Sequence, residues 1–124
     1  MKKIIETDKA PAAIGSYSQA VKAGSTLYIS GQIPLNIEGE LIMTSIKDQT
    51  EQVLKNLEAI LKEAGGNFSN VVKATIYTDD ISYFNEINEV YGRSFKKEPP
   101  ARAFVEVSAL PKGVNVEIEA IAEL

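Results

Sequence analysis

Apolar and polar residues alternate along several short stretches of the chain, and this alternation is typical of β-strands with one buried face. The alternation predicts a strand over residues 25–30 that ends at Gly31, and another over residues 115–122. Residues 71–78 are rich in β-branched side chains and predict a buried strand. The segment 17–24 is the predicted hairpin partner of 25–30.

A further strand is predicted after the two prolines at positions 99 and 100. One side of this strand carries Ala101, Ala103, Val105 and Val107. The other side carries Arg102, Phe104 and Glu106. The arginine therefore lies near the start of a strand, beside a loop. At such a strand end, a sheet protein can expose one charged side chain to a ligand while the strand holds it in place.

Two stretches have the helical period instead. From residue 45 onward, apolar side chains recur at three- and four-residue intervals, at Val53, Leu54, Leu57, Ile60, Leu61 and Ala64. Ser45-x-x-Asp48 resembles a capping box, and the glycine pair at 65–66 ends the run. A second helix is predicted from about residue 80 to 95, before the proline pair.

The order of these elements predicts an α+β fold with both helices on one face of a mixed sheet of about six strands, in a single domain spanning residues 1–124. The turn at 110–113 has proline and glycine at favourable positions, so residues 101–107 and 115–122 are expected to form a hairpin. Antiparallel pairing would place Arg102 near Glu117 or Glu119.

Composition narrows the class of protein. The chain has 124 residues and 13.5 kDa, with 44% hydrophobic and 24% charged residues, which suits one soluble globular domain. No stretch is long enough to span a bilayer, and the amino terminus lacks the apolar core of a signal peptide. There is no cysteine to form a disulfide, so a cytoplasmic location is expected.

Charge and missing residue types exclude several functions. A net charge of −4 and a pI near 4.9 make nucleic acid an unlikely main partner. The chain has neither histidine nor cysteine, which removes the usual nucleophile–histidine pairs and zinc or copper ligand sets. No GxGxxG or P-loop is present either. Any catalysis would therefore rest on carboxylates, hydroxyls, lysine, arginine and backbone groups.

Three charged residues are candidates for chemistry. Arg102 is either a solvated strand residue in a surface ion pair or a clamp for a ligand carboxylate, which a planar guanidinium matches at two points. Glu117 and Glu119 share one strand face. They are either the wet side of an antiparallel sheet or a pair of catalytic carboxylates.

Four polar or glycine positions complete the candidate set. Asn88 lies on the apolar stripe of the second helix, at the margin of the core or hydrogen-bonded to something brought to that face. Tyr17 and Ser30 carry hydroxyls near the ends of predicted elements, and Gly31 permits close approach of the backbone. These patterns alone indicate a small α+β domain with a candidate anion-binding arginine.

Four segments together resemble the RidA (YjgF) family of reactive-intermediate deaminases along nearly the whole chain. They are APAAIGSYSQAV, SGQIPLN, KATIYTDDISYFNEINEVYG and PPARAFVEVSALPKGVNVEIEAIA. The spacing from PAR to VEIEA is the most specific of these features. The resemblance implies a RidA-like, chorismate-mutase-like homotrimer with three clefts at the subunit interfaces.

The resemblance also implies an activity: hydrolysis of enamine and imine acids such as 2-aminoacrylate and 2-aminocrotonate to 2-keto acids and ammonia, without metal or cofactor. Arg102 matches the family arginine that grips the substrate carboxylate, and Glu117 matches the acid that positions a water. Positions that match the pocket lining are Tyr17, Ser30, Gly31 and Asn88.

One position departs from the family pattern. Many members have cysteine two residues after the arginine, where this chain has Phe104. The resemblance gives that position a backbone role toward the ligand, so hydrolysis should survive, while a phenyl ring would narrow the pocket. Two alternatives stay open: a non-catalytic sensor of 2-keto acids, and the ribonuclease or translation-inhibitor activity attributed to some relatives, against which the acidic pI argues.

Overall fold

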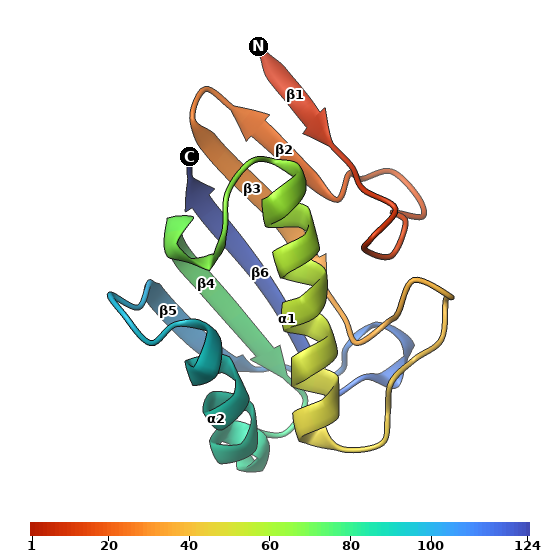
Figure 1. Cartoon of the computed structure of the whole chain (residues 1–124). Coiled ribbons are helices and arrows are strands. Elements are labelled where there is room, and N and C mark those ends of the chain that lie inside the picture. Colours follow the sequence, from red (N-terminus) through yellow and green to blue (C-terminus); the bar gives the residue numbers. More distant parts are fainter.

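Six strands form one sheet, and two helices cover one of its faces (Figure 1). The computed structural model describes all residues 1–124. The strands are β1 (Lys2–Ile5), β2 (Ala20–Ala23), β3 (Thr26–Gln32), β4 (Val71–Thr78), β5 (Ala101–Glu106) and β6 (Val116–Glu123), and the helices are α1 (Ile46–Glu63) and α2 (Phe84–Ser94). Their order across the sheet is β1-β2-β3-β6-β4-β5. The predicted α+β architecture is confirmed.

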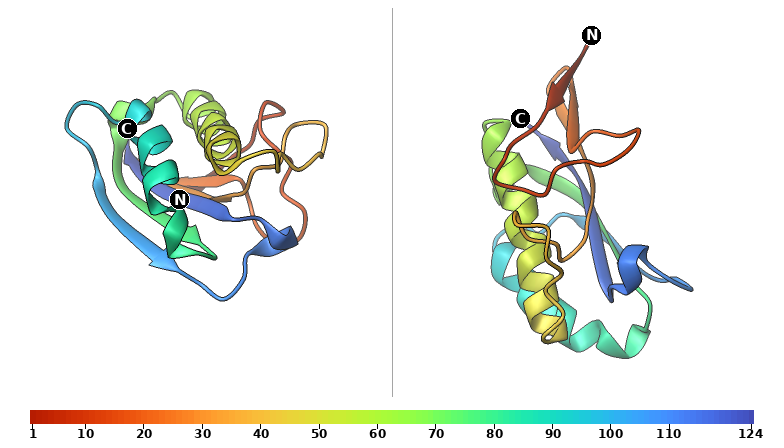
Figure 2. Two further views of the ribbon diagram at one scale, coloured as in Figure 1. Left: turned by 90° about the horizontal axis from the view of Figure 1, so that it is seen from below. Right: turned by 90° about the vertical axis from the view of Figure 1, so that its right-hand side faces the viewer.

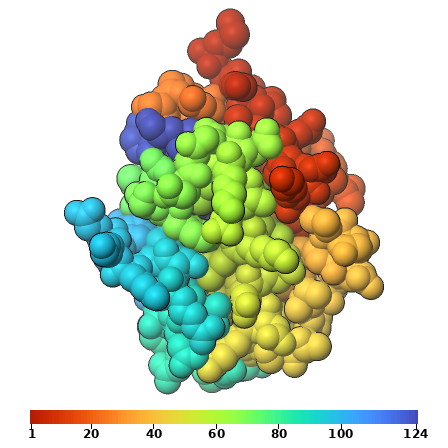
Figure 3. Space-filling model, in the orientation of Figure 1, coloured from red at the N-terminus to blue at the C-terminus, as the bar shows by residue number.

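Helix α1 begins and ends where the sequence predicts. The Ser45 hydroxyl accepts a hydrogen bond from the Asp48 amide at 3.0 Å, which caps the first turn. Gly65 follows the helix with a φ of +89°, a conformation that favours glycine and stops the helix. The periodic apolar residues of α1, including Val53 and Ile60, are buried against the sheet. In Figure 3, α1 runs down the middle of the helical face, flanked by α2 and the N-terminal segment.

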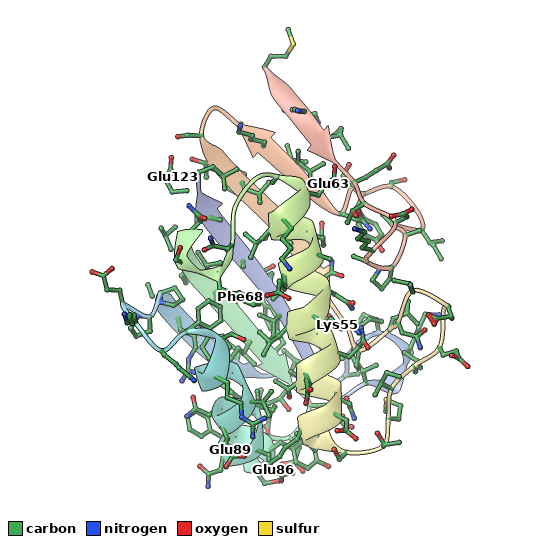
Figure 4. The ribbon with its side chains drawn as sticks, viewed as in Figure 1. Lys55, Glu63, Phe68, Glu86, Glu89 and Glu123 are labelled. Carbon is green, nitrogen blue, oxygen red and sulfur yellow. The ribbon has the colours of Figure 1, made fainter.

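Helix α2 follows a short 3-10 turn, Ile81–Tyr83, which the Asp80 side chain caps by accepting from the Ser82 amide at 2.9 Å. Its buried residues include Ile87 and Val90, which belong to the hydrophobic core. Figure 4 shows Glu86 and Glu89 projecting from α2, and Lys55 and Glu63 from α1, away from the core. This charged outer side is typical of an amphipathic surface helix.

The two faces of the sheet differ sharply. On β4 and β6, the residues toward the helices are buried: Ala74, Ile76 and Thr78, and Val116, Ile118 and Ala120. The alternate residues, among them Tyr77, Glu117 and Glu119, lie on the other face. The right-hand view of Figure 2 shows both helices on the same side of the sheet. We call the side without helices the open face.

One expectation about strand pairing is wrong. β5 and β6 do not form a hairpin, because β4 lies between them. β5 pairs with β4 in parallel, whereas β6 pairs antiparallel with both β4 and β3. Two parallel strands need a crossover connection, and α2 supplies it between β4 and β5. The predicted turn exists at Pro111–Gly113, but it carries the chain past β4 to the middle of the sheet.

The chain begins with a strand that the hydrophobic pattern does not identify. β1 has only four residues and pairs antiparallel with β2, with Lys2 opposite Ala23. Four residues are too few for a periodicity to stand out.

No helix of the structure has the length and apolar character needed to cross a membrane.

Candidate active site

Arg102 lies on the side of β5 that faces the helices, because it is in register with the buried Ala74 of β4. Its Nη1 donates a hydrogen bond to Oδ1 of Asn88 on α2 at 2.7 Å. The amide on the apolar stripe of α2 is therefore the acceptor for this arginine. The sequence singles out both residues as candidates, and the structure brings them together.

The guanidinium of Arg102 has no carboxylate partner within the chain. The three ion pairs of the structure join Lys47 to Glu89, Lys62 to Glu58 and Arg93 to Glu89. A guanidinium has five N–H donors, and the bond to Asn88 uses one of them. Because Arg102 is exposed, its other donors and its charge remain available to an anion from outside the chain.

Glu117 lies half-buried on the open face of β6. Its carboxylate covers the backbone of Gly31, where a Cβ atom would overlap it. The sheet is irregular at this point, since the register of β3 against β6 shifts between Ile29 and Gln32. Glycine at position 31 thus makes room for the Glu117 side chain, and any larger residue would displace it.

The surroundings of Glu117 favour the protonated form of its carboxyl group. Burial, and then the negative charge of Glu119, raise the pKa of Glu117 above the ordinary value of a glutamate. Its neighbour Glu119 is exposed and accepts a hydrogen bond from the Tyr77 hydroxyl at 2.9 Å, which raises the pKa of Tyr77. Of the two acids, Glu117 has the surroundings expected of a proton-transferring group.

Three other candidates lie near the Glu117 end of the sheet. Tyr17 and Gly31 line one cavity of about 290 Å³. Tyr17 is exposed, and its hydroxyl accepts a hydrogen bond from the Ile14 amide at 3.4 Å. The Ser30 hydroxyl donates to the Ser18 carbonyl at 2.6 Å, which ties β3 to the segment that carries Tyr17.

The candidates thus fall into two groups. The arginine group comprises Arg102 and Phe104 on the helical face of β5 and Asn88 on α2. The glutamate group, around β3 and β6, is Tyr17, Ser30, Gly31 and Glu117. The expectation that Arg102 lies near Glu117 or Glu119 is wrong, because β4 separates the two strands and the side chains lie on opposite faces of the sheet.

Sequence reasoning missed two contacts of the arginine. The rings of Phe84 and Tyr91 lie 5.8 and 5.1 Å from the Arg102 Cζ atom. The signal was present, since Phe84 and Tyr91 share the apolar stripe of α2 with Asn88, but apolar residues at that spacing usually mean only core. No three carboxylates lie close enough together to hold a metal ion.

An α+β sheet with helices on one side, an exposed arginine without a carboxylate partner and a half-buried acid fit a protein that binds small molecules. The chain belongs to the YjgF/RidA family: the family model described as "Endoribonuclease L-PSP" matches residues 7–124. It is 53% identical to a RutC family protein of Pyrococcus horikoshii over 98% of both chains. It is 50% identical to the human 2-iminobutanoate/2-iminopropanoate deaminase, over 98% of this chain and 90% of that one.

Solved structures agree with the fold throughout. A putative endoribonuclease from Thermotoga maritima superposes with a TM-score of 0.98 at 52% identity, covering 100% of this chain and 98% of that one. E. coli TdcF, solved with bound serine, gives a TM-score of 0.94 at 43% identity over 98% of both chains. The RidA-like fold predicted from the sequence is confirmed.

Proposed function

We propose that the protein is an imine deaminase that hydrolyses 2-imino acids, formed from enamines such as 2-aminoacrylate or 2-aminocrotonate, to 2-keto acids and ammonia. The observation that carries the proposal is the Arg102 guanidinium, exposed and without a carboxylate partner in the chain. A 2-imino acid supplies that carboxylate. Relatives named 2-iminobutanoate/2-iminopropanoate deaminase support the same chemistry, and serine in TdcF is likewise a small molecule with a carboxylate.

Arg102 would hold the substrate carboxylate at two points, which fixes the imine carbon relative to the acid. A water oxygen then bonds to C2 of the protonated imine while Glu117 accepts one water proton. Glu117 returns that proton to the amino nitrogen and then, as a carboxylate again, accepts the proton of the C2 hydroxyl as the C2–N bond breaks. The products are the 2-keto acid and ammonia, which takes up the Glu117 proton and leaves as ammonium. An acid whose pKa is raised by burial suits both transfers.

The proposal includes a homotrimer with the site shared between subunits. Within one chain, the arginine and glutamate groups lie on opposite faces of the sheet, so one small ligand cannot contact both. Two chains side by side bring the arginine group of one to the glutamate group of the next. Exposed apolar side chains on the open face, Tyr28 and Val105 among them, supply surface for such contacts.

The charge of the chain argues against the ribonuclease that the family model's name describes. A net charge of −4 works against the electrostatic attraction on which binding to a nucleic-acid phosphate backbone depends. The proposal also keeps the expected cytoplasmic location and a role in removing reactive intermediates, with no metal or cofactor.

The deciding experiment measures ammonia and keto acid released from freshly generated 2-aminoacrylate, with and without the protein. We expect clear acceleration over the solvent reaction, and light scattering near three times 13.5 kDa. No acceleration together with pyruvate binding would favour the 2-keto acid sensor. A monomer at micromolar concentration would contradict the shared site.

A further inference from the structure

Three aromatic rings surround the Arg102 guanidinium, and together we call them the aromatic clamp: Phe84 and Tyr91 from α2, and Phe104 from β5. The Arg102 Cζ atom lies 5.1 Å from the Tyr91 ring centroid and 5.8 Å from each of the other two. All three distances fall within the range in which a cation is attracted to an aromatic ring. In addition, Asn88 accepts a hydrogen bond from the Arg102 guanidinium.

Packing in the protein core holds the Tyr91 side of the aromatic clamp in place. Tyr91 is only 4% exposed and packs on Phe95, with ring centroids 4.5 Å apart. Its hydroxyl is buried and has no hydrogen-bond partner, so the part of Tyr91 that acts on Arg102 is the ring. At the other side, Phe84 and Phe104 contact each other with centroids 4.7 Å apart. The three rings are therefore held by the core and by one another.

We propose that the aromatic clamp positions Arg102 for the carboxylate of the ligand, with Phe104 and Tyr91 as positioning residues. An exposed arginine is long and flexible, and one hydrogen bond leaves most of its rotamers open. The clamp restricts the guanidinium before the ligand arrives, and such preorganisation raises affinity because less freedom is lost on binding. The side chain of Phe104, and not only its backbone, then contributes to the site.

This inference rests on the proposed role of Arg102 and predicts an effect mainly on binding. Phe104→Leu removes one ring while keeping an apolar side chain on the edge strand β5. We expect the dissociation constant for pyruvate and the KM for the imino acid to rise about fivefold to tenfold. The turnover number should change less than about twofold, because Arg102 keeps its two-point fork toward the bound carboxylate and Glu117 is unchanged.

The test compares variants that keep or lose a ring. Phe104→Tyr and Tyr91→Phe keep the ring and should bind pyruvate as the wild type does. Phe104→Leu should not. Phe68→Leu is the matched control, and Phe68 is labelled in Figure 4. Phe68 packs on Phe95 with centroids 5.2 Å apart, and Phe95 in turn packs on Tyr91 of the clamp. The effect of Phe68→Leu should be on thermal stability alone.

A second readout reports on Arg102 directly. In proton–nitrogen NMR spectra, the Nε–H resonance of Arg102 should be shifted by the ring currents of the clamp, and Phe104→Leu should move it toward the value of a free arginine. The proposal that the clamp positions Arg102 is overturned if Phe104→Leu keeps both the wild-type affinity for pyruvate and the wild-type Arg102 resonance. Failure of the wild type to release ammonia would instead overturn the deaminase proposal, and the resonance would still test the clamp.

Discussion

The arginine group and the glutamate group show two ways of holding a charged side chain. Arg102 is exposed, hydrogen-bonded to Asn88 and surrounded by rings, none of which competes for its charge. Glu117 is half-buried over Gly31 and has no hydrogen bond from another side chain. The first environment preserves a permanent cation, and the second raises the pKa of an acid.

The two environments suit different tasks. A guanidinium stays protonated at any working pH, so the arginine group suits anchoring. A glutamate with a raised pKa exchanges protons more readily near neutrality, so the glutamate group suits chemistry. The two groups should therefore fail differently when each is changed as little as possible.

The largest effect is expected for Glu117→Gln, which keeps the shape and removes the proton acceptor. Turnover should fall about 10²-fold or more, while the affinity for pyruvate holds or improves slightly as a negative charge disappears. Steady-state kinetics and a pyruvate titration check both. Normal turnover would show that the assignment of the water-positioning acid is wrong, and Glu119 would be the next candidate.

The next prediction tests whether the arginine group of one chain and the glutamate group of another form one site. Arg102→Ala and Glu117→Gln should each be nearly inactive. When equal amounts are unfolded and refolded together, each cleft in the randomly assembled trimers has even odds of an intact arginine group and even odds of an intact glutamate group. About a quarter of wild-type activity should therefore return. No recovery in verified mixed trimers would place the whole site within one chain.

A smaller effect is expected for Arg102→Lys, which keeps the charge and loses the two-point fork. The carboxylate is still attracted, but its orientation loosens, so KM should rise and turnover should fall together, lowering kcat/KM about tenfold to a hundredfold. Lys97, on the loop before β5, provides the control: Lys97→Arg should behave as the wild type. A change in turnover alone would contradict the anchoring role.

The smallest effect is a shift in pH dependence. The base form of Glu117 is lost as pH falls through its pKa, so kcat/KM should fall on the acid side. Glu119→Gln removes a negative charge that raises this pKa, so the acid limb should move to lower pH with little change at neutral pH. A pH–rate profile of both proteins measures it. A limb that stays in place would show that Glu119 does not act on the titrating group.

Local patterns in the sequence predict both helices and every strand except β1, and they single out most of the candidate residues. Hydrophobic periodicity predicts α1 and the buried faces of β4 and β6, because the three- to four-residue and two-residue repeats are local properties of helices and strands. The same local logic singled out Asn88, an amide on an apolar stripe, which the structure shows hydrogen-bonded to Arg102.

Which strands are neighbours depends on contacts in the tertiary structure. The turn before β6 favours a hairpin with β5, yet β6 lies between β3 and β4, where its apolar residues pack under α1. Burial of that face outweighs the local preference of a turn, because burial draws on contacts from the whole sheet. The same pairing places Arg102 and Glu117 on opposite faces and gathers the rings of Phe84, Tyr91 and Phe104 around the arginine, since both depend on contacts between residues far apart in the chain.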